Sequence, residues 1–590
     1  MNWLQPSDPL NSIFLSALIA AFPIMFICWA LVIRKMKGYL ASLLTVIIAL
    51  AIAIIAYRMP VTLALLSTAH GAMYGLFPIC WIIITAVFLY NLSVKSGQFE
   101  IIKNFMATIT PDRRIQAILI AFCFGAFLEG TAGMGTPVAI TAAMLAGLGF
   151  NPLYAAGLCL IANTVPVAFG GIGIPVTVAS QVSGLPEMAI SQMIGRTLPL
   201  LSLLVPFYLV LIMSGWKKTM EVLPAILVTG LSFSILQWFS SNYMSPMLPD
   251  VISSIGSIIS LLLLLKFWKP KSVWRFRDET PENILLNVKY TPGQILKAWS
   301  PWLILTAIII AWGLKPVKDT LDATGMWRFE VPGLHNVILG GENGQSPISQ
   351  IFKFNFLSAT GTAILITTII SIFVFNISFK TALSVLHSTL GQMKYPVLTI
   401  SSVLGFAYLA NNSGMSITMA KALTNTGIFF PFFSPVLGWL GVFLTGSDTS
   451  SNALFGKLQS TTASALDIDP VLTVSANASG GVTGKMISPQ SIAVGAAAVG
   501  LVGKESDLFR FTFRHSFIFL LLICIITVLQ AYVFKWLIPV YKIVSNDQIS
   551  SKPDLTQGLI YLLILAAVIS ALVTIVTILN RTVKANVKNT

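Results

Sequence analysis

The fold is decided by residues 125–175, which read GAFLEGTAGMGTPVAITAAMLAGLGFNPLYAAGLCLIANTVPVAFGGIGIP. The apolar approach to this stretch is too short to complete a membrane span, and it reaches a polar, glycine-rich turn at 129–137 before apolar residues resume. We therefore expect a re-entrant hairpin at 115–150, followed by a broken helix at 153–180. The alternative is an ordinary loop between two short helices. Polar backbone at membrane depth survives only where protein lines a cavity, which favours the hairpin.

The same pattern returns in the second half of the chain. Phe127-Leu-Glu-Gly130 corresponds to Phe443-Leu-Thr-Gly446, and in each half an asparagine, Asn163 or Asn477, precedes a proline by twelve positions. The common order of these landmarks predicts two homologous halves. Matched apolar segments that are interrupted by glycine and proline indicate the binding site of a secondary transporter. The second hairpin and the second broken helix are expected at 432–466 and 470–502.

The composition excludes a water-soluble fold. Of 590 residues, 56% are hydrophobic and 10% are charged, whereas soluble domains carry about 25% charged residues. Most of the chain must therefore lie in a lipid bilayer. The net charge of +15 resides in short basic clusters between apolar runs, as in cytoplasmic loops, so we predict no nucleic-acid partner. The five cysteines lie in apolar runs without metal-binding or disulfide spacing, and nothing in the sequence implies a metal or a cofactor.

Spanning-length apolar runs recur along the chain, and we estimate about 11–14 spans. The run at 301–313 is short unless preceding residues join it, whereas the run at 356–378 is long enough alone. The basic cluster at 34–37 follows the first span and the tail is basic, which predicts an external N-terminus and an internal C-terminus. The expected organisation is a first half at 1–313, an external connecting loop at 314–352, a second half at 353–540, and a C-terminal transmembrane helix with a basic tail at 541–590.

Three ionisable residues in the interrupted segments are functional candidates, because charged groups inside a membrane are rare. Glu129 and Asp448 lie in the two expected hairpin tips, and burial of a carboxyl group favours its protonated form. Either acid is a candidate for the coupled proton, although each could instead stay ionised in a water-filled vestibule. Lys485, in the second broken segment, would hold a substrate carboxylate or pair with Asp448.

Two other polar residues, His70 and Arg196, are more simply explained by a structural role than by a functional one. His70 precedes an apolar span and is more often a satisfied interfacial histidine than a functional one. Arg196 precedes an apolar run, where snorkelling at a helix end is the simpler account. The chain has no Walker A motif, no HExxH motif and no other enzyme constellation. We therefore predict a transporter that is neither driven by ATP nor an enzyme.

Three stretches resemble the L-lactate permease family. They are the opening stretch at 125–175, FFSPVLGWLGVFLTGSDTSSNALF at 432–455, and GGVTGKMISPQSIAVGAAAVGLVGKESDLFRFT at 480–512. The resemblance extends to about residue 540 and is loose at 314–352. It implies import of L-lactate, D-lactate and glycolate by proton symport across a bacterial plasma membrane. It also implies an all-α polytopic fold of the ion transporter superfamily, with two inverted repeats, each with a re-entrant hairpin and a broken helix, and elevator-type movement.

The resemblance places the substrate between the hairpin tips and the broken helices. Sodium-coupled relatives carry Ser-Asn-Thr at the tips, whereas this chain carries Glu-Gly-Thr and Ser-Asp-Thr, which favours protons as the coupled ion. The expected proton-coupling residues are Glu129 and Asp448. The expected substrate-binding residues are Thr131, Gly133, Thr136, Asn163, Gly171, Ser447, Thr449, Ser450, Asn452, Asn477, Lys485 and Ser488.

The expected partners are a small monocarboxylate, protons and the bilayer, with a homodimer left open as the assembly. The alternative within the same class is a sodium-coupled or exchange carrier for a related small carboxylate. A channel needs a continuous pore, whereas two repeats with broken helices fit alternating access better. A membrane enzyme would need the catalytic constellation that the sequence lacks.

Overall fold

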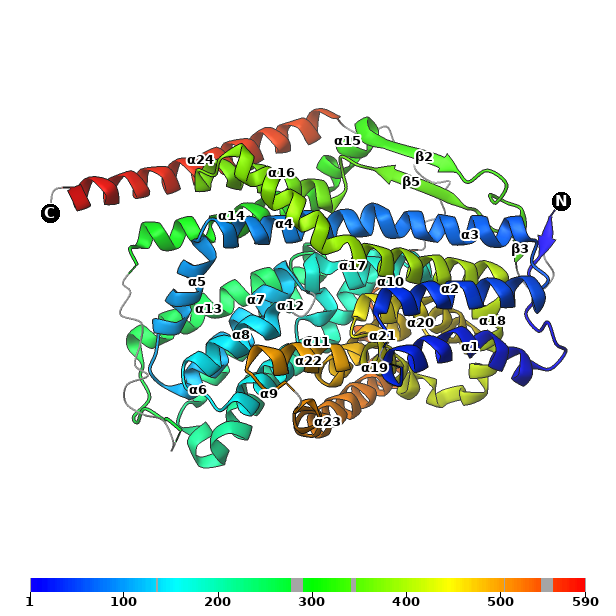
Figure 1. The fold of residues 1–590 in the computed structure, drawn as a ribbon, viewed down its shortest axis with the longest axis horizontal. Helices are drawn as coiled ribbons and strands as arrows, with labels where there is room; N and C mark the ends of the chain where they lie inside the picture. The colour runs from blue at the N-terminus through cyan, green and yellow to red at the C-terminus, as the bar shows by residue number, and fades with distance from the viewer. Residues whose placement is uncertain are drawn as a thin grey trace.

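The computed structural model describes residues 2–34, 36–133, 136–276, 290–340, 346–502, 504–542 and 555–588. Within these residues, 11 helices are long and apolar enough to cross a membrane, or 12 if a bent pair counts as one further span. The predicted all-α polytopic fold is confirmed. The N-terminus and the short strands lie at one end of the molecule, and the C-terminus lies at the opposite end (Figure 1).

The N-terminal helices pack against one long helix of the second half. Helices α1 (Ile13–Val32) and α2 (Gly38–Ile55) precede α3 (Val61–Tyr74), the π-turn η1 (Gly75–Cys80) and α4 (Trp81–Lys95). Helix α17 (Phe379–Ser413) runs along α2, α3 and α4. Two glycines of α3 and η1 make this contact possible, because a Cβ atom on Gly71 would lie 2.3 Å from the Leu404 carbonyl oxygen.

Two helical arms occupy the residues expected to form the first hairpin. After α5 (Gln98–Thr108), its first arm comprises α6 (Arg113–Gln116), the π-helix η2 (Ala117–Phe124) and α7 (Gly125–Thr131). Its second arm is α8 (Thr136–Gly147). The first arm is 19 residues long and fully buried inside the protein, so it is longer than the apolar run in the sequence suggested.

The broken helix of the first half follows the hairpin. Asn151 caps α9 (Pro152–Ala162) by accepting a hydrogen bond from the backbone N–H of Leu153. The chain then bends by 61° through η3 (Val167–Phe169) into α10 (Gly170–Ser183). Three successive residues at the break, Gly171 to Gly173, have left-handed backbone angles, with φ of 54° to 73°. The Gly-Gly-Ile-Gly sequence permits this conformation, because two of the three lack a Cβ atom.

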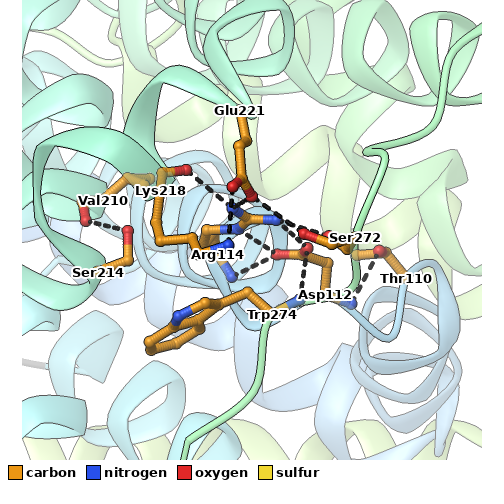
Figure 2. A network of polar contacts seen from close by, with 9 residues as sticks. All are labelled: Thr110, Asp112, Arg114, Val210, Ser214, Lys218, Glu221, Ser272 and Trp274. Atoms are coloured by element: carbon orange, nitrogen blue, oxygen red, sulfur yellow. Dashed lines mark hydrogen bonds and ion pairs between the residues drawn. The ribbon is translucent and has the colours of Figure 1, made fainter.

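A buried ion-pair network fixes the base of the first hairpin. The Arg114 guanidinium is fully buried and donates to Asp112, to Glu221 at 2.9 Å and to the Ser272 carbonyl oxygen at 2.8 Å. Figure 2 shows these residues converging from three separate segments. Arg113 and Arg114 belong to one of the basic clusters between apolar runs that were expected in cytoplasmic loops. The structure instead buries both, because the carboxylates of Asp112 and Glu221 compensate the Arg114 charge.

Four further helices complete the first half. They are α11 (Glu187–Met220), α12 (Leu223–Tyr243), α13 (Pro249–Phe267) and α14 (Pro292–Gly313). Thr291 and Gln294 form a capping box at the start of α14. Residues before the apolar run therefore join it, and α14 reaches 22 residues.

The segment at 314–352 was predicted as a loop but contains regular structure. It holds α15 (Lys315–Gly325) and the strands β2 (Met326–Glu330), β3 (Ile338–Gly340) and β4 (Ser346–Pro347), with β5 (Ile351–Asn355) at its end. Strands β2 and β5 pair antiparallel. Strand β1 (Trp3–Leu4) pairs parallel with β3, which joins the N-terminus to the middle of the chain.

The second half repeats the hairpin and the break. After α16 (Thr360–Phe375), α17, α18 (Met415–Leu423) and η4 (Thr424–Phe429), the hairpin arms are α19 (Phe430–Thr445) and α20 (Asp448–Ala465). The broken helix comprises α21 (Pro470–Gly484), the 3-10 turn η5 (Lys485–Ile487) and α22 (Pro489–Ala498). The chain ends with α23 (Glu505–Tyr532), η6 (Lys535–Leu537) and α24 (Leu555–Lys588).

One predicted span is shorter than expected. The apolar run at 356–378 predicted a complete crossing, but α16 has 16 residues. At 1.5 Å per residue it is about 24 Å long, less than the roughly 30 Å hydrocarbon core. The chain leaves strand β5 only five residues before α16 begins, so the first residues of the run form the turn between them.

Candidate functional site

The tip of the first hairpin rests on the break of the first broken helix. Glu129, in the last turns of α7, is 4% exposed. A Cβ atom built on Gly170 would lie 2.8 Å from Oε1 of Glu129, so the carboxyl group occupies the space that a side chain at this position would fill. A Cβ atom built on Gly133 would lie 3.4 Å from the backbone nitrogen of Gly171, so the tip also approaches the break closely here.

The second half makes the corresponding contact. Ser447 caps α20 by accepting from the Ser450 backbone N–H, and Asp448 occupies the first turn of this helix. A Cβ atom built on Gly481 would lie 2.3 Å from Oδ1 of Asp448. In both halves, therefore, the acid of the hairpin tip is seated on a glycine of the broken helix of the same half.

Lys485 contacts the tip of the second hairpin. Its side chain is 6% exposed and its Nζ donates to the carbonyl oxygen of Gly446 at 2.8 Å. The Lys485 charge acts favourably on both Glu129 and Asp448. The one hydrogen bond of Lys485 among the described residues goes to Gly446, so its predicted pairing with Asp448 stays a prediction. Figure 1 shows α7, α10, α20 and α21, which carry the tips and the breaks, toward the centre of the molecule.

The two equivalent asparagines have different surroundings. Asn477 is fully bonded, because its Nδ2 donates to Oδ1 of Asn452 at 2.8 Å and its Oδ1 accepts from Nε2 of Gln459 at 3.2 Å. Asn163 is 2% exposed and lies beside Glu129. In the part of the chain that the structure describes, neither of its amide atoms has a hydrogen-bond partner of good geometry. The first half therefore holds an unsatisfied polar group where the second half holds a satisfied one.

Other unsatisfied polar atoms accompany Asn163. A buried polar atom without a partner costs about 1–3 kcal/mol, so a group of them indicates a place where a ligand supplies the missing bonds. Among the described residues, the buried side-chain atoms without a partner near the tips and breaks are Oε2 of Glu129, Oγ1 of Thr164, both carboxyl oxygens of Asp250, Oδ1 of Asp448 and Oγ of Ser479.

Three of the other predicted binding residues have structural partners. The Thr131 hydroxyl donates to the Phe127 carbonyl oxygen at 2.8 Å. Asn452 donates to the Pro175 carbonyl oxygen at 3.1 Å and so ties α20 to the first broken helix. Ser488 caps α22. Ser450 is buried, and Thr449 lies beside it in the first turn of α20. The side chain of Thr136 lies outside the described residues.

His70 and Arg196 lie in structural contacts. Nδ1 of His70 is 2.9 Å from Oε1 of Gln350, and its ring packs among three aromatic rings of which none belongs to a tip. His70 is buried rather than interfacial, because strand β5 and the residues before it cover α3. Arg196 donates to Oδ1 of Asn242 at 2.8 Å and to the Leu537 carbonyl oxygen at 2.9 Å. It therefore joins three segments instead of snorkelling.

Asp250 was not predicted from the sequence as a functional residue. This residue lies in the first turn of α13 and is 1% exposed. A Cβ atom built on Gly130 would lie 2.6 Å from Cβ of Asp250, so the acid faces the first hairpin tip. Its signal in the sequence was an acid at the start of an apolar run, which looks like an ordinary first-turn residue of a transmembrane helix.

Comparisons with known proteins show the family of this chain. The family model described as L-lactate permease matches residues 16–534. The L-lactate permease of Bacillus subtilis (strain 168) is 54% identical over 91% of this chain and 100% of its own length, and that of Escherichia coli (strain K12) is 52% identical over 91% and 100%. The glycolate permease GlcA of Escherichia coli (strain K12) is 52% identical over 90% and 99%.

Among solved structures, the transporter MtrF of Neisseria gonorrhoeae is similar over 83% of this chain and 95% of its own, with 12% identity and a TM-score of 0.46. That likeness is too weak to transfer any feature of MtrF. The family model and the relatives, by contrast, cover nearly the whole chain. The chain belongs to the L-lactate permease family.

Proposed function

We propose that this chain is a secondary active transporter that imports L-lactate, and also D-lactate and glycolate, together with protons. The observation that carries the proposal is a buried lysine, Lys485, at the second hairpin tip, in a site whose two hairpin acids are also buried. The relatives named for lactate and glycolate support the substrate class, since both are small 2-hydroxymonocarboxylates.

The substrate carboxylate would bind near Lys485. The ammonium group already donates one hydrogen bond, to Gly446, and has two further N–H groups. The N-termini of α10, α20 and α22 add positive ends of helix dipoles at the breaks and the tip. A carboxylate at this position would thus meet a cation and backbone donors together.

The 2-hydroxyl group of the substrate would bind Asn163. The amide of Asn163 has no hydrogen bond of good geometry among the described residues and only Glu129 beside it, whereas the amide of Asn477 is occupied by Asn452 and Gln459. Loss of one buried hydrogen-bond partner costs about 1–3 kcal/mol, which corresponds to roughly five- to 150-fold in affinity.

The coupled proton would bind Glu129 or Asp448. Both acids are buried, and one lysine is too little positive charge to balance both acids and a substrate anion. A proton that binds with the substrate restores this balance, which is the physical basis of symport here. The sodium-coupled alternative remains an outcome of the test described below.

The hairpins and broken helices would move together as an elevator-type transport domain. The second hairpin and its broken helix are closely joined, because a Cβ atom on Gly438 would lie 1.8 Å from the Asn477 carbonyl oxygen. The protein is a multi-pass membrane protein of the bacterial inner membrane. The basic cluster at 34–37 and the basic tail support an external N-terminus and an internal C-terminus.

The test is uptake of labelled L-lactate into proteoliposomes under a pH gradient alone and under a sodium gradient alone. Accumulation under the pH gradient only is expected. Glu129→Gln and Asp448→Asn should then identify the coupling acid, with Asp319→Asn, an exposed residue paired with Lys315, as the matched control. Accumulation under sodium only would overturn proton coupling, and accumulation under neither gradient would overturn the proposed substrate.

A further inference from the structure

Asp250 has a position that the two hairpin acids do not explain. It lies on α13, outside both hairpins and both broken helices, yet it faces the tip of the first hairpin across Gly130. The loop before it also reaches the break of the first broken helix, because a Cβ atom on Gly173 would lie 2.4 Å from the Pro246 carbonyl oxygen. The start of α13 therefore touches both elements of the first half that form the site.

Asp250 has no compensating group. Both carboxyl oxygens are buried, and neither has a hydrogen-bond partner within the residues that the structure describes. Aspartate in the first turn of a helix usually accepts backbone hydrogen bonds there or faces water, and this side chain does neither. A carboxylate buried in this way pays a large desolvation penalty, which its protonated form avoids.

The elements packed against α13 bring no positive charge to Asp250. Helix α10, which meets the loop before α13, has no charged residue. Lys266 lies 16 residues from Asp250 on α13, and Lys297 lies 16 residues from Gly313, the end of α14 that meets this loop. Each separation is about 24 Å along a helix. The titratable groups on the packed elements are Glu129 from α7, Cys123 from η2 beside Ser257, the exposed Tyr243 from α12, and these two lysines from α13 and α14.

The charge that acts on Asp250 is therefore another carboxylate, that of Glu129, whose neighbour Gly130 Asp250 contacts. The negative charges of Glu129 and Asp250 repel each other, whereas Lys485 acts on Glu129 and on Asp448. With all three acids ionised, the site would hold three negative charges and one positive charge. Two neighbouring carboxyl groups in such surroundings share a proton, because both cannot be ionised at once without a large cost.

We propose that Asp250 is a proton-binding residue of the transport cycle and that it holds one proton jointly with Glu129. The two carboxyl groups titrate as a pair, with one on the hairpin tip and the other on α13. Displacement of the tip against α13 separates the pair and changes its affinity for the proton. This inference rests on the proposed lactate transport for its functional consequence, but the shared proton is a property of the protein alone.

The first test separates proton movement from substrate movement. Exchange of labelled for unlabelled L-lactate needs no net proton transfer, whereas accumulation under a pH gradient does. A pH difference of one unit accumulates the anion about tenfold when one proton accompanies it. Asp250→Asn in proteoliposomes should retain exchange within about threefold of wild type and lose this accumulation, giving a ratio near one. Asp319→Asn, at an exposed ion pair, should retain both.

The second test needs no substrate. The infrared C=O stretch of protonated carboxyl groups in the purified protein, compared between acidic and alkaline pH, should lose one titrating component in Asp250→Asn. Glu129→Gln should shift the titration of the component that remains. Should Asp250→Asn lose its folded peak in size exclusion, the smaller Asp250→Ser replaces it with the same expectations.

The outcomes distinguish the role of Asp250 from the proposed transport function. Full accumulation by Asp250→Asn, or loss of exchange together with accumulation in a folded protein, would overturn the role of Asp250. An unchanged infrared titration would do the same. If wild type accumulates no lactate under a pH gradient while the infrared component still depends on Asp250, the proposed function fails and the shared proton stands.

Discussion

The buried Arg114 network permits a quantitative prediction about the base of the first hairpin. Arg114→Met keeps the apolar stem and removes the guanidinium group, which leaves the Asp112 carboxylate buried at 1% side-chain exposure without its cation. Breaking a buried ion pair from one side costs about 3–5 kcal/mol. At about 2 °C per kcal/mol, as in larger domains, Tm should fall by roughly 6–10 °C.

The assay is thermal unfolding of the detergent-solubilised protein, followed by the loss of its monodisperse size-exclusion peak. The matched control is Lys218→Met, which removes an ion pair with Glu221 whose side chains are 45% and 32% exposed. Exposed pairs contribute about 0–1 kcal/mol, so this variant should stay within about 2 °C of wild type. Equal decreases in Tm for the two variants would refute the reasoning, because a buried ion pair would then contribute no more stability than an exposed one.

The same network has a defined pH dependence. Hydrogen bonds from Lys218 and then Arg114 lower the pKa of Glu221 from 4.5 to about 2. A lowered pKa means that the stabilisation is fully present above pH 4.5 and is lost as the pH falls toward 2. The difference in Tm between wild type and Arg114→Met should therefore stay constant from pH 8 to pH 5 and shrink only below about pH 4.5. A difference that already shrinks between pH 7 and pH 5 would contradict this assignment.

The remaining predictions concern the tips and the breaks. Gly481→Ala should reduce lactate uptake at least about tenfold, because its Cβ atom would displace the Asp448 carboxyl group. The control Gly391→Ala, which has open space at its Cβ position, should not reduce uptake. Equal uptake by both variants would contradict the close contact between Gly481 and Asp448. Asn163→Ala should raise KM for L-lactate roughly five- to 150-fold with little change in Tm, whereas Asn477→Ala should lower Tm, because only Asn477 makes hydrogen bonds of good geometry. A raised KM in Asn477→Ala and a lowered Tm in Asn163→Ala would contradict these roles.

The hairpins and broken helices were predictable because their chemistry is local. Polar and glycine-rich residues interrupt the apolar runs at 129–137 and at Thr445–Asn452, and no lipid-facing helix tolerates such interruptions. Asn151-Pro152 and Asp469-Pro470 stand at the starts of α9 and α21, where the structure shows a side-chain cap in both halves. The identity of the tip acids and of Lys485 followed from the rarity of charge in these segments.

Features that depend on distant partners were not predictable. Asn163 and Asn477 occupy equivalent places in the repeat, but only the second hairpin supplies Gln459; the first carries Ala143-Met-Leu145 near the corresponding position. Arg114 looks like a solvated loop residue until Glu221 and Ser272, more than a hundred residues away, are placed beside it. Asp250 was hidden for the same reason, since its importance depends on the approach of Gly130.

The paired strand at the N-terminus has a practical consequence for protein production. Trp3 and Leu4 form strand β1 against β3, Gln5 donates to the Asn411 carbonyl oxygen at 2.5 Å, and Thr418 donates to the Ser7 carbonyl oxygen. A purification tag fused directly before Trp3 would compete with these contacts for space. A tag after the C-terminal helix α24, at the opposite end of the molecule, avoids them and is the better handle for purification (Figure 1).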